Sequence, residues 1–213
     1  MRIPGWTRLA STAGFLVLAP RAAEAHLVST GLGPVYDGIF HFLLSPDELF
    51  PVIAFSLFAG LRGRGHARCV LFLLPGAWLL GGIVGTYGLA PTALAEQAVT
   101  GAVFLLAGGL LAADIDVPAP VLAAIVIAFG LTRGVVDMAG LLAGTERSGG
   151  TGIIPLVGID VAVFVLVALT ASLSLPLQVT WMRVAVRYAG SCISALGLLL
   201  VGWSIHMAQL ASR

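Results

Sequence analysis

The chain has 213 residues, of which 59% are hydrophobic and only 10% are charged, and its mean hydropathy is +1.04. Because an ordinary soluble domain carries about 25% charged residues, this composition excludes the soluble classes and indicates a membrane protein. The basic residues are all arginine and the net charge is +1, so nothing in the charge balance indicates a nucleic-acid partner.

Residues 1–25 have the pattern of a secretory signal peptide. Two arginines precede a short apolar run at 9–19, and Ala-Glu-Ala follows as a small-x-small cleavage site. The alternative is an uncleaved first span, but this run is too short to cross roughly 30 Å of hydrocarbon as a helix. Cleavage after Ala25 would leave His26 at the N-terminus, where its amine and imidazole form a bidentate nitrogen donor suited to copper or nickel.

Apolar runs of spanning length recur six times after this segment and predict an all-α, polytopic membrane helix bundle. Each spanning helix needs about 20 residues. The runs lie at 46–62, 69–91, 96–113, 119–143, 153–175 and 184–208. Glycine-rich stretches such as LLGGIVG allow close helix packing, as is common in membrane bundles. We expect a single transmembrane domain over residues 26–213.

The arginines predict which side of the membrane each loop faces. Arg62, Arg64 and Arg68 follow the first run, and Arg183 and Arg187 lie at the start of the last one. Positively charged loops tend to stay in the cytoplasm, which places both segments on the inner side. We therefore expect a multi-pass protein of the bacterial inner membrane, with its mature N-terminus and its C-terminus in the periplasm.

Ionisable residues gather in the outer half of this predicted bundle. An ionisable group inside a span is costly and marks a functional site by default, because it usually faces the bundle interior or a water-filled cavity. The candidates are His41, Asp47, Glu48, Glu96, Arg133, Asp137 and Asp160. Because they come from several spans but from one leaflet, they predict a site at the outer face.

Two interpretations remain open for the residues at the start of the first span. In one, Ser45 is the N-cap, Pro46 takes the first helical position and Glu48 completes a capping box, so the acids only begin a helix. The segment before Ser45 is then separate, and lies along the interface or re-enters the bundle. In the other, His41 joins Asp47 and Glu48 to bind a divalent first-row metal, which imidazole with carboxylate suits.

The acids of the later spans have different predicted partners. Arg133 and Asp137 are four residues apart on one helix face, which predicts an intrahelical ion pair. Asp160 has no partner near it in the sequence. It either pairs with Arg133 across helices, binds the metal or carries a proton.

The stretch HFLLSPDELFPVIAFSLFAGL resembles the first-span signature of the HupE/UreJ family of nickel permeases, roughly His-Pro-x-x-Gly-x-Asp-His before an apolar helix. His41 and Asp47 match the first histidine and the aspartate, and Glu48 stands at the second histidine. Glu96 resembles the glutamate of the family's third span. The signal peptide, the six spans and the chain length also agree. The resemblance therefore covers essentially the whole chain and implies a metal site built from these residues.

The fourth span departs from the family pattern. The family often has His-Gly-x-Ala-His-Gly followed by an acid, whereas FGLTRGVVDMAG keeps both glycines but has Phe129 and Arg133 at the histidine positions. Asp137 lies one residue beyond the usual acid. For this divergent sequence, the resemblance implies a site with more oxygen ligands and a fixed positive charge.

The function implied by the resemblance is that of a secondary transporter, a permease for a divalent transition-metal ion. Nickel is favoured, with copper, cobalt and zinc as alternatives. Motifs for ATP binding, dinucleotide binding and serine hydrolysis are absent. We therefore expect transport without ATP, no enzymatic activity and no cofactor besides the metal, with the lipid bilayer as the other partner.

Two other classes of protein stay open. One is a non-transporting accessory protein that holds nickel or copper at the outer face, or delivers it to a periplasmic or membrane metalloenzyme. The other is a membrane enzyme that uses metal-activated water. Metal flux separates the permease from both.

Overall fold

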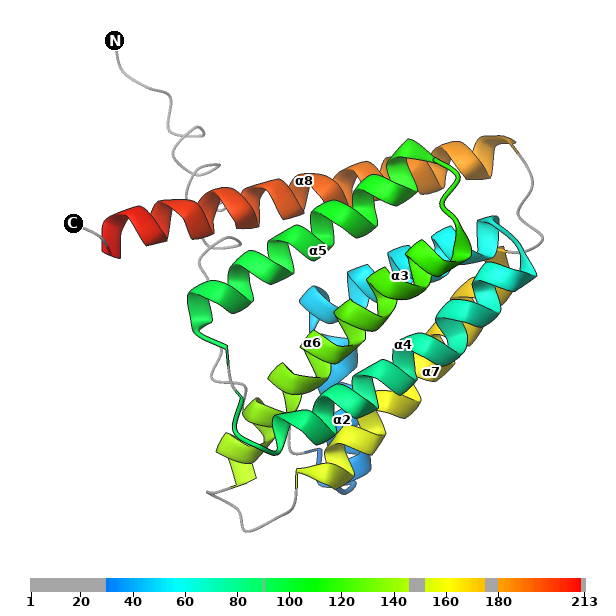
Figure 1. Cartoon of the computed structure of the whole chain (residues 1–213). Coiled ribbons are helices and arrows are strands. Elements are labelled where there is room, and N and C mark those ends of the chain that lie inside the picture. Colours follow the sequence, from blue (N-terminus) through cyan, green and yellow to red (C-terminus); the bar gives the residue numbers. More distant parts are fainter. Residues whose placement is uncertain (1–29, 90, 146–151, 175–179, 212–213) are drawn as a thin grey trace, which may run out of the picture.

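The computed structural model describes residues 30–89, 91–145, 152–174 and 180–211, and these ranges form seven α-helices without a strand (Figure 1). The predicted signal peptide and His26 lie outside the described residues. The helices are α2 (Pro34–Leu44), α3 (Pro46–Leu61), α4 (Arg64–Gly85), α5 (Ala93–Ala113), α6 (Ala119–Thr145), α7 (Ile153–Ser174) and α8 (Thr180–Ala211). The all-helical membrane bundle predicted from the sequence is confirmed.

The helices from α4 to α8 are each long and apolar enough to cross a membrane, and α2 with α3 adds a sixth span if this bent pair counts as one. The predicted apolar runs thus fall on helices whose ends differ from the predicted ends by a few residues. The agreement has a physical cause. Hydrocarbon cannot hydrogen-bond exposed backbone groups, so a lipid-spanning run has to form its backbone hydrogen bonds internally.

The first span is broken at Ser45, where α2 and α3 meet at a bend of 76°. Pro46 does begin α3, but the predicted capping box is wrong: Ser45 makes no side-chain cap. Its hydroxyl instead donates a hydrogen bond to the carbonyl oxygen of His41, 2.7 Å away in the last turn of α2. Glu48 is likewise engaged elsewhere, by Arg133 of α6. The segment before Ser45 is a separate helix, and it packs against α7.

The central part of the bundle is formed by α3, α4, α6 and α7 around an aromatic core. The indole of Trp78 stands edge-on to Phe42, with ring centroids 6.0 Å apart, and edge-on to Phe129 at 5.6 Å. Helices α4 and α6 lie in close contact because Gly130 and Gly134 face α4 without side chains. A Cβ atom on either glycine would collide with the α4 backbone. These are the glycines that the fourth-span pattern retained.

Helices α5 and α8 form a second tight unit, and they lie side by side along one edge of the bundle in Figure 1. Their backbones approach through Gly108 and Gly190, each of which leaves no room for a Cβ. This pair contacts the other helices mainly through α3. Helices α5 and α6 are consecutive in the chain, but within their described ranges they make almost no contact with each other.

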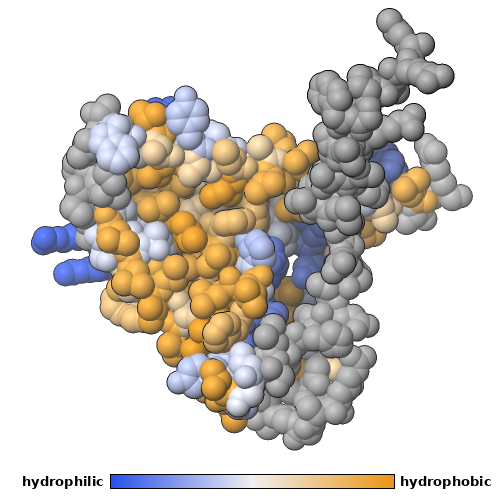
Figure 2. All heavy atoms as spheres, turned by 180° about the vertical axis from the view of Figure 1, so that it is seen from behind, coloured by the Kyte–Doolittle hydropathy of each residue, from blue (hydrophilic) through white to orange (hydrophobic). Residues whose placement is uncertain are grey.

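The outer surface of the described helices is mostly apolar. Figure 2 shows hydrophobic residues over most of the described face seen from behind. Large side chains such as Phe72, Leu80 and Leu198 are around 60% exposed, at 64%, 59% and 62%. In water such a surface would be an aggregation hazard, whereas against lipid tails it is the expected exterior of a membrane protein.

Candidate functional site

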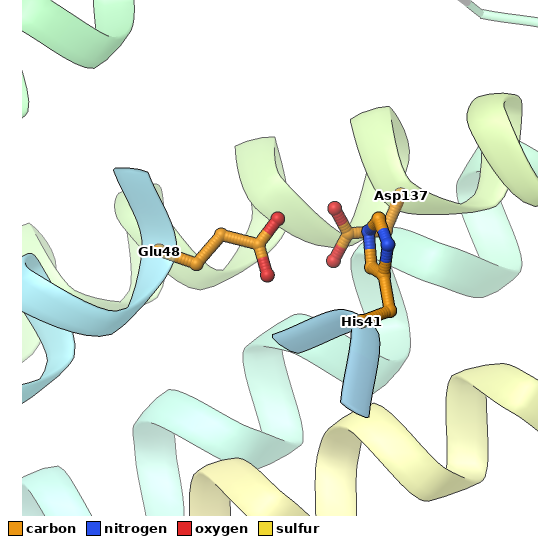
Figure 3. Close-up of side chains that lie close together, drawn as sticks. All are labelled: His41, Glu48 and Asp137. Carbon is orange, nitrogen blue, oxygen red and sulfur yellow. The ribbon is translucent and has the colours of Figure 1, made fainter. Parts of the chain in front are cut away.

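Three potential metal ligands from three different helices converge inside the bundle: His41 of α2, Glu48 of α3 and Asp137 of α6. One ligand atom from each lies within 4.8 Å of the others, and their side chains point toward one another in Figure 3. Glu48 and Asp137 are buried, and His41 is partly buried. We refer to these three residues as the ligand cluster.

The break in the first span explains how two of these residues meet. His41 and Glu48 lie on opposite sides of Ser45, in helices that meet at 76°. A continuous helix would place residues seven apart about 10 Å from each other along its axis, since the rise is 1.5 Å per residue. The bend instead turns the last turn of α2 and the first turn of α3 toward a common point.

Asp137 is held in place by Trp78 of α4. The indole Nε1 donates to Asp137 Oδ2 at 2.7 Å, and both groups are buried. Because α4 and α6 approach closely at Gly130 and Gly134, this hydrogen bond can span the two helices. Trp78 was not among the site residues predicted from the sequence, although a lone tryptophan in the middle of an otherwise apolar run is a signal that could have identified it.

Arg133 connects the acids of α3 with those of α6. Its Nη2 atom lies 2.9 Å from Asp47 Oδ2 and also forms an ion pair with Glu48 Oε1. The predicted ion pair with Asp137 is present at 3.8 Å, but the closer partners come from another helix. Arg133 therefore joins α6 to α3 and also lies near Asp137 in its own helix.

The electrostatic balance of this region favours a further positive charge. Counted as formal charges, the three carboxyl groups of Asp47, Glu48 and Asp137 and the guanidinium of Arg133 sum to −2, which a bound divalent cation would balance. Glu48 Oε2 is buried and has no hydrogen-bond partner among the described residues. A buried, unpaired carboxylate oxygen costs free energy, so an incoming cation would find a ligand atom already free of competing bonds.

A cavity of about 400 Å³ reaches this region from the side, between α5 and α6. Asp47, Glu96 and Arg133 line it, together with mostly apolar side chains. A second cavity of about 380 Å³ shares Val99 and Phe129 with the first and continues along the same two helices. Glu96 thus faces the same cavity as Asp47, but the structure does not bring it into the ligand cluster.

Asp160 lies apart from these residues, in α7. Its Oδ1 atom is buried and has no hydrogen-bond partner among the described residues. Among the described residues, no ion pair joins it to Arg133, whose partners are the acids named above. Of the three predicted roles for Asp160, a metal ligand and a proton carrier stay predictions.

The opposite end of the bundle carries a separate polar contact. Arg62 forms an ion pair with Asp114 at 2.8 Å and lies 5.0 Å from the centre of the Phe58 ring. His66 is hydrogen-bonded to the carbonyl oxygen of Val117 at 3.0 Å. These contacts join the loop after α3 and the first turn of α4 to the loop after α5.

Comparison with known proteins gives one result. The family described as HupE / UreJ protein matches residues 14–200, which is most of the chain. No curated protein and no solved structure matches. This family is known for nickel or cobalt transporters and accessory membrane proteins rather than for enzymes. The resemblance drawn from the first and third spans is confirmed, and the chain belongs to the HupE/UreJ family.

Proposed function

We propose that the protein is a permease for a divalent transition-metal ion, with nickel the favoured cargo. In this proposal His41, Glu48 and Asp137 bind the ion, and Asp47 and Glu96 attract it into the cavity that they line. The protein would lie in the bacterial inner membrane with the ligand cluster toward the periplasm, as the arginine distribution predicts.

The observation that carries this proposal is the ligand cluster itself, with its unpartnered Glu48 oxygen. One imidazole and two carboxylates suit divalent first-row ions better than alkali ions. Three ligand atoms spaced evenly on one ion with bonds of about 2.1 Å lie at most about 3.6 Å apart. The ligand atoms lie within 4.8 Å of one another, which places each about 2.8 Å from a common centre, so each would have to move toward the ion by under about 1 Å.

The driving force can come from the membrane potential. Moving one charge across 100 mV is worth about 2.3 kcal/mol, so a dication moving inward gains roughly twice that. The sequence contains no ATP-binding motif, and uptake driven by the membrane potential does not need ATP.

An accessory protein that binds metal without transporting it is the second candidate. The observation that favours it is the opposite end of the bundle, where Arg62 and Asp114 are paired and no further metal-ligand group occurs among the described residues. Such a protein would hold the ion at the outer face for a metalloenzyme. It would bind metal as tightly as a permease but would not release it inside.

Uptake into proteoliposomes separates these candidates. We would measure nickel, cobalt, zinc and copper accumulation with the parent protein and with Glu48→Gln and Asp137→Asn, which keep the side-chain size and remove the charge. Asp116→Asn is the matched control, because Asp116 is an exposed acid outside the ligand cluster.

We expect saturable uptake of one metal by the parent and by Asp116→Asn, and loss of uptake in both cluster variants. Binding without uptake would instead support the accessory protein. Equal uptake by the parent and by both cluster variants, at equal amounts in the membrane, would refute the site.

A further inference from the structure

We infer that Arg133 is a tethered counter-cation: its fixed charge reduces the formal charge of the three carboxyl groups at the metal site from −3 to −2 and so adapts the site to a divalent ion that has to be released again. This inference rests on the proposed function. Arg133 acts on the ion through the carboxylates that it contacts, and it is therefore a positioning residue rather than a ligand.

The contacts of Glu48 are the first part of the argument. Its Oε1 atom is paired with Arg133, and its Oε2 atom is buried without a hydrogen-bond partner. A carboxylate can serve two cations through its two oxygens. Arg133 thus fixes the orientation of Glu48 and leaves the second oxygen for the ion shared with His41 and Asp137.

The burial of the guanidinium is the second part. The side chain of Arg133 is only 7% exposed, and that of Glu48 only 1%. Charges at such depth interact strongly, because the surroundings have a low dielectric constant. A guanidinium stays protonated at any physiological pH. The site consequently carries a permanent positive charge a few ångströms from the place where the ion would bind.

The consequence for metal binding follows from Coulomb's law. Three carboxylates alone would bind a dication tightly and release it slowly, whereas the repulsion from Arg133 weakens that binding. A transport site has to bind well enough to be filled and weakly enough to be emptied. Arg133 therefore lowers the equilibrium affinity of the site and raises the rate of release.

Four proteins test the role of charge: the parent, Arg133→Gln, Asp47→Asn and the double variant. We would titrate nickel into each full-length protein in lipid nanodiscs by calorimetry. Because Arg133 is buried, we expect Arg133→Gln to bind nickel at least about tenfold more tightly. We expect Asp47→Asn to bind nickel more weakly but by a smaller factor, because its side chain is 44% exposed and solvent screens its charge. The double variant restores the formal charge of −2, so its affinity should fall from that of Arg133→Gln toward that of the parent.

Uptake kinetics give a second readout that a purely structural role would not produce. Arg133→Gln should lower both KM and kcat, because the ion binds more tightly and leaves more slowly. Arg133→Lys keeps the charge, and it should keep both values within about threefold of the parent. The lysine variant also keeps the inference testable if the glutamine variant does not fold, since weaker binding by Arg133→Lys would contradict it.

A trivalent ion tests whether Arg133 acts through its charge. The repulsion from Arg133 grows with the charge of the ion, so Arg133→Gln should gain more affinity for terbium than for nickel. Terbium emission is sensitised by a nearby indole, and Trp78 donates a hydrogen bond to Asp137 inside the site. An equal change in the two affinities would overturn the inference.

The possible failures can be told apart. If Arg133→Gln binds nickel more weakly than the parent, or the double variant does not recover, Arg133 only holds the fold and the inference is wrong while the metal site stands. If the parent binds none of the four metals, the proposed function fails and this inference fails with it.

Discussion

Gly134 gives a direct test of how the bundle holds the metal site together. A Cβ atom added there would lie 2.6 Å from the backbone nitrogen of Gly82, whereas ordinary contacts begin at 3.4 Å. Gly134→Ala therefore has to separate α4 and α6 locally by at least about 0.8 Å, the difference between 3.4 and 2.6 Å, and by more at the Trp78 carbonyl oxygen, to which the added Cβ would lie closer still. The hydrogen bond from Trp78 to Asp137, one turn away, is 2.7 Å long. A displacement of about 0.8 Å or more would stretch it to about 3.5 Å or beyond, where it is no longer effective.

The expected loss of stability follows from three contributions. Overpacking a close contact costs about 1–3 kcal/mol, and losing a hydrogen bond to a charged group costs about 1.5–3 kcal/mol. Alanine in place of glycine in a helix returns about 1 kcal/mol. We expect the free energy of unfolding of Gly134→Ala to fall by about 1.5–5 kcal/mol, and its nickel affinity to fall with it because Asp137 is no longer held.

The assay is reversible unfolding in mixed micelles with increasing SDS, followed by tryptophan fluorescence. Gly140→Ala is the matched control, since it lies in the same helix and an added Cβ would meet nothing within 4 Å. We expect the control to be as stable as the parent or slightly more stable. Equal stability of the two alanine variants, together with an unchanged nickel affinity, would refute the reasoning.

Three further changes test other parts of the structure. Ser45→Ala removes the hydroxyl that donates a hydrogen bond to the His41 carbonyl oxygen. We expect the free energy of unfolding to fall by about 1 kcal/mol in the same assay, and calorimetry to show weaker nickel binding. An unchanged nickel affinity would mean that the bend holds without this hydrogen bond. Asp160→Asn should leave nickel uptake unchanged because Asp160 is outside the ligand cluster, and a tenfold loss, about 1.4 kcal/mol, would contradict this. A double-mutant cycle on Arg62 and Asp114 should give a coupling energy of about 0.5–1 kcal/mol that decreases at high salt. A coupling of zero would mean that the ion pair does not stabilise this end of the bundle.

The positions of the helices could be predicted from the sequence because a bilayer leaves few alternatives. An apolar run of about 20 residues has to be a helix in lipid, and the runs at 119–143 and 153–175 correspond closely to α6 and α7. The proximity of His41 to Glu48 was also within reach of sequence reasoning, since both lie near Ser45 and Pro46.

The interhelical contacts could not be predicted in the same way. The spacing of Arg133 and Asp137 identified the pair within α6, but the closer partners of Arg133 belong to α3, more than 80 residues earlier in the chain. That contact depends on how closely the helices pack, and the glycines that set this distance show their partners only in the folded structure. The capping box failed for a related reason: at the bend the Ser45 hydroxyl donates to the carbonyl oxygen of His41, and its oxygen accepts no hydrogen bond from the backbone of α3.

The arrangement of α5 and α8 has a mechanical consequence. These two helices pack tightly on each other but touch the remaining described helices mainly through α3, so the described helices divide into two groups that meet mainly along α3. The cavity lined by Asp47 and Glu96 lies between these groups, not within either of them. A small rotation of one group against the other would change the width of this cavity and leave both glycine-mediated helix interfaces intact.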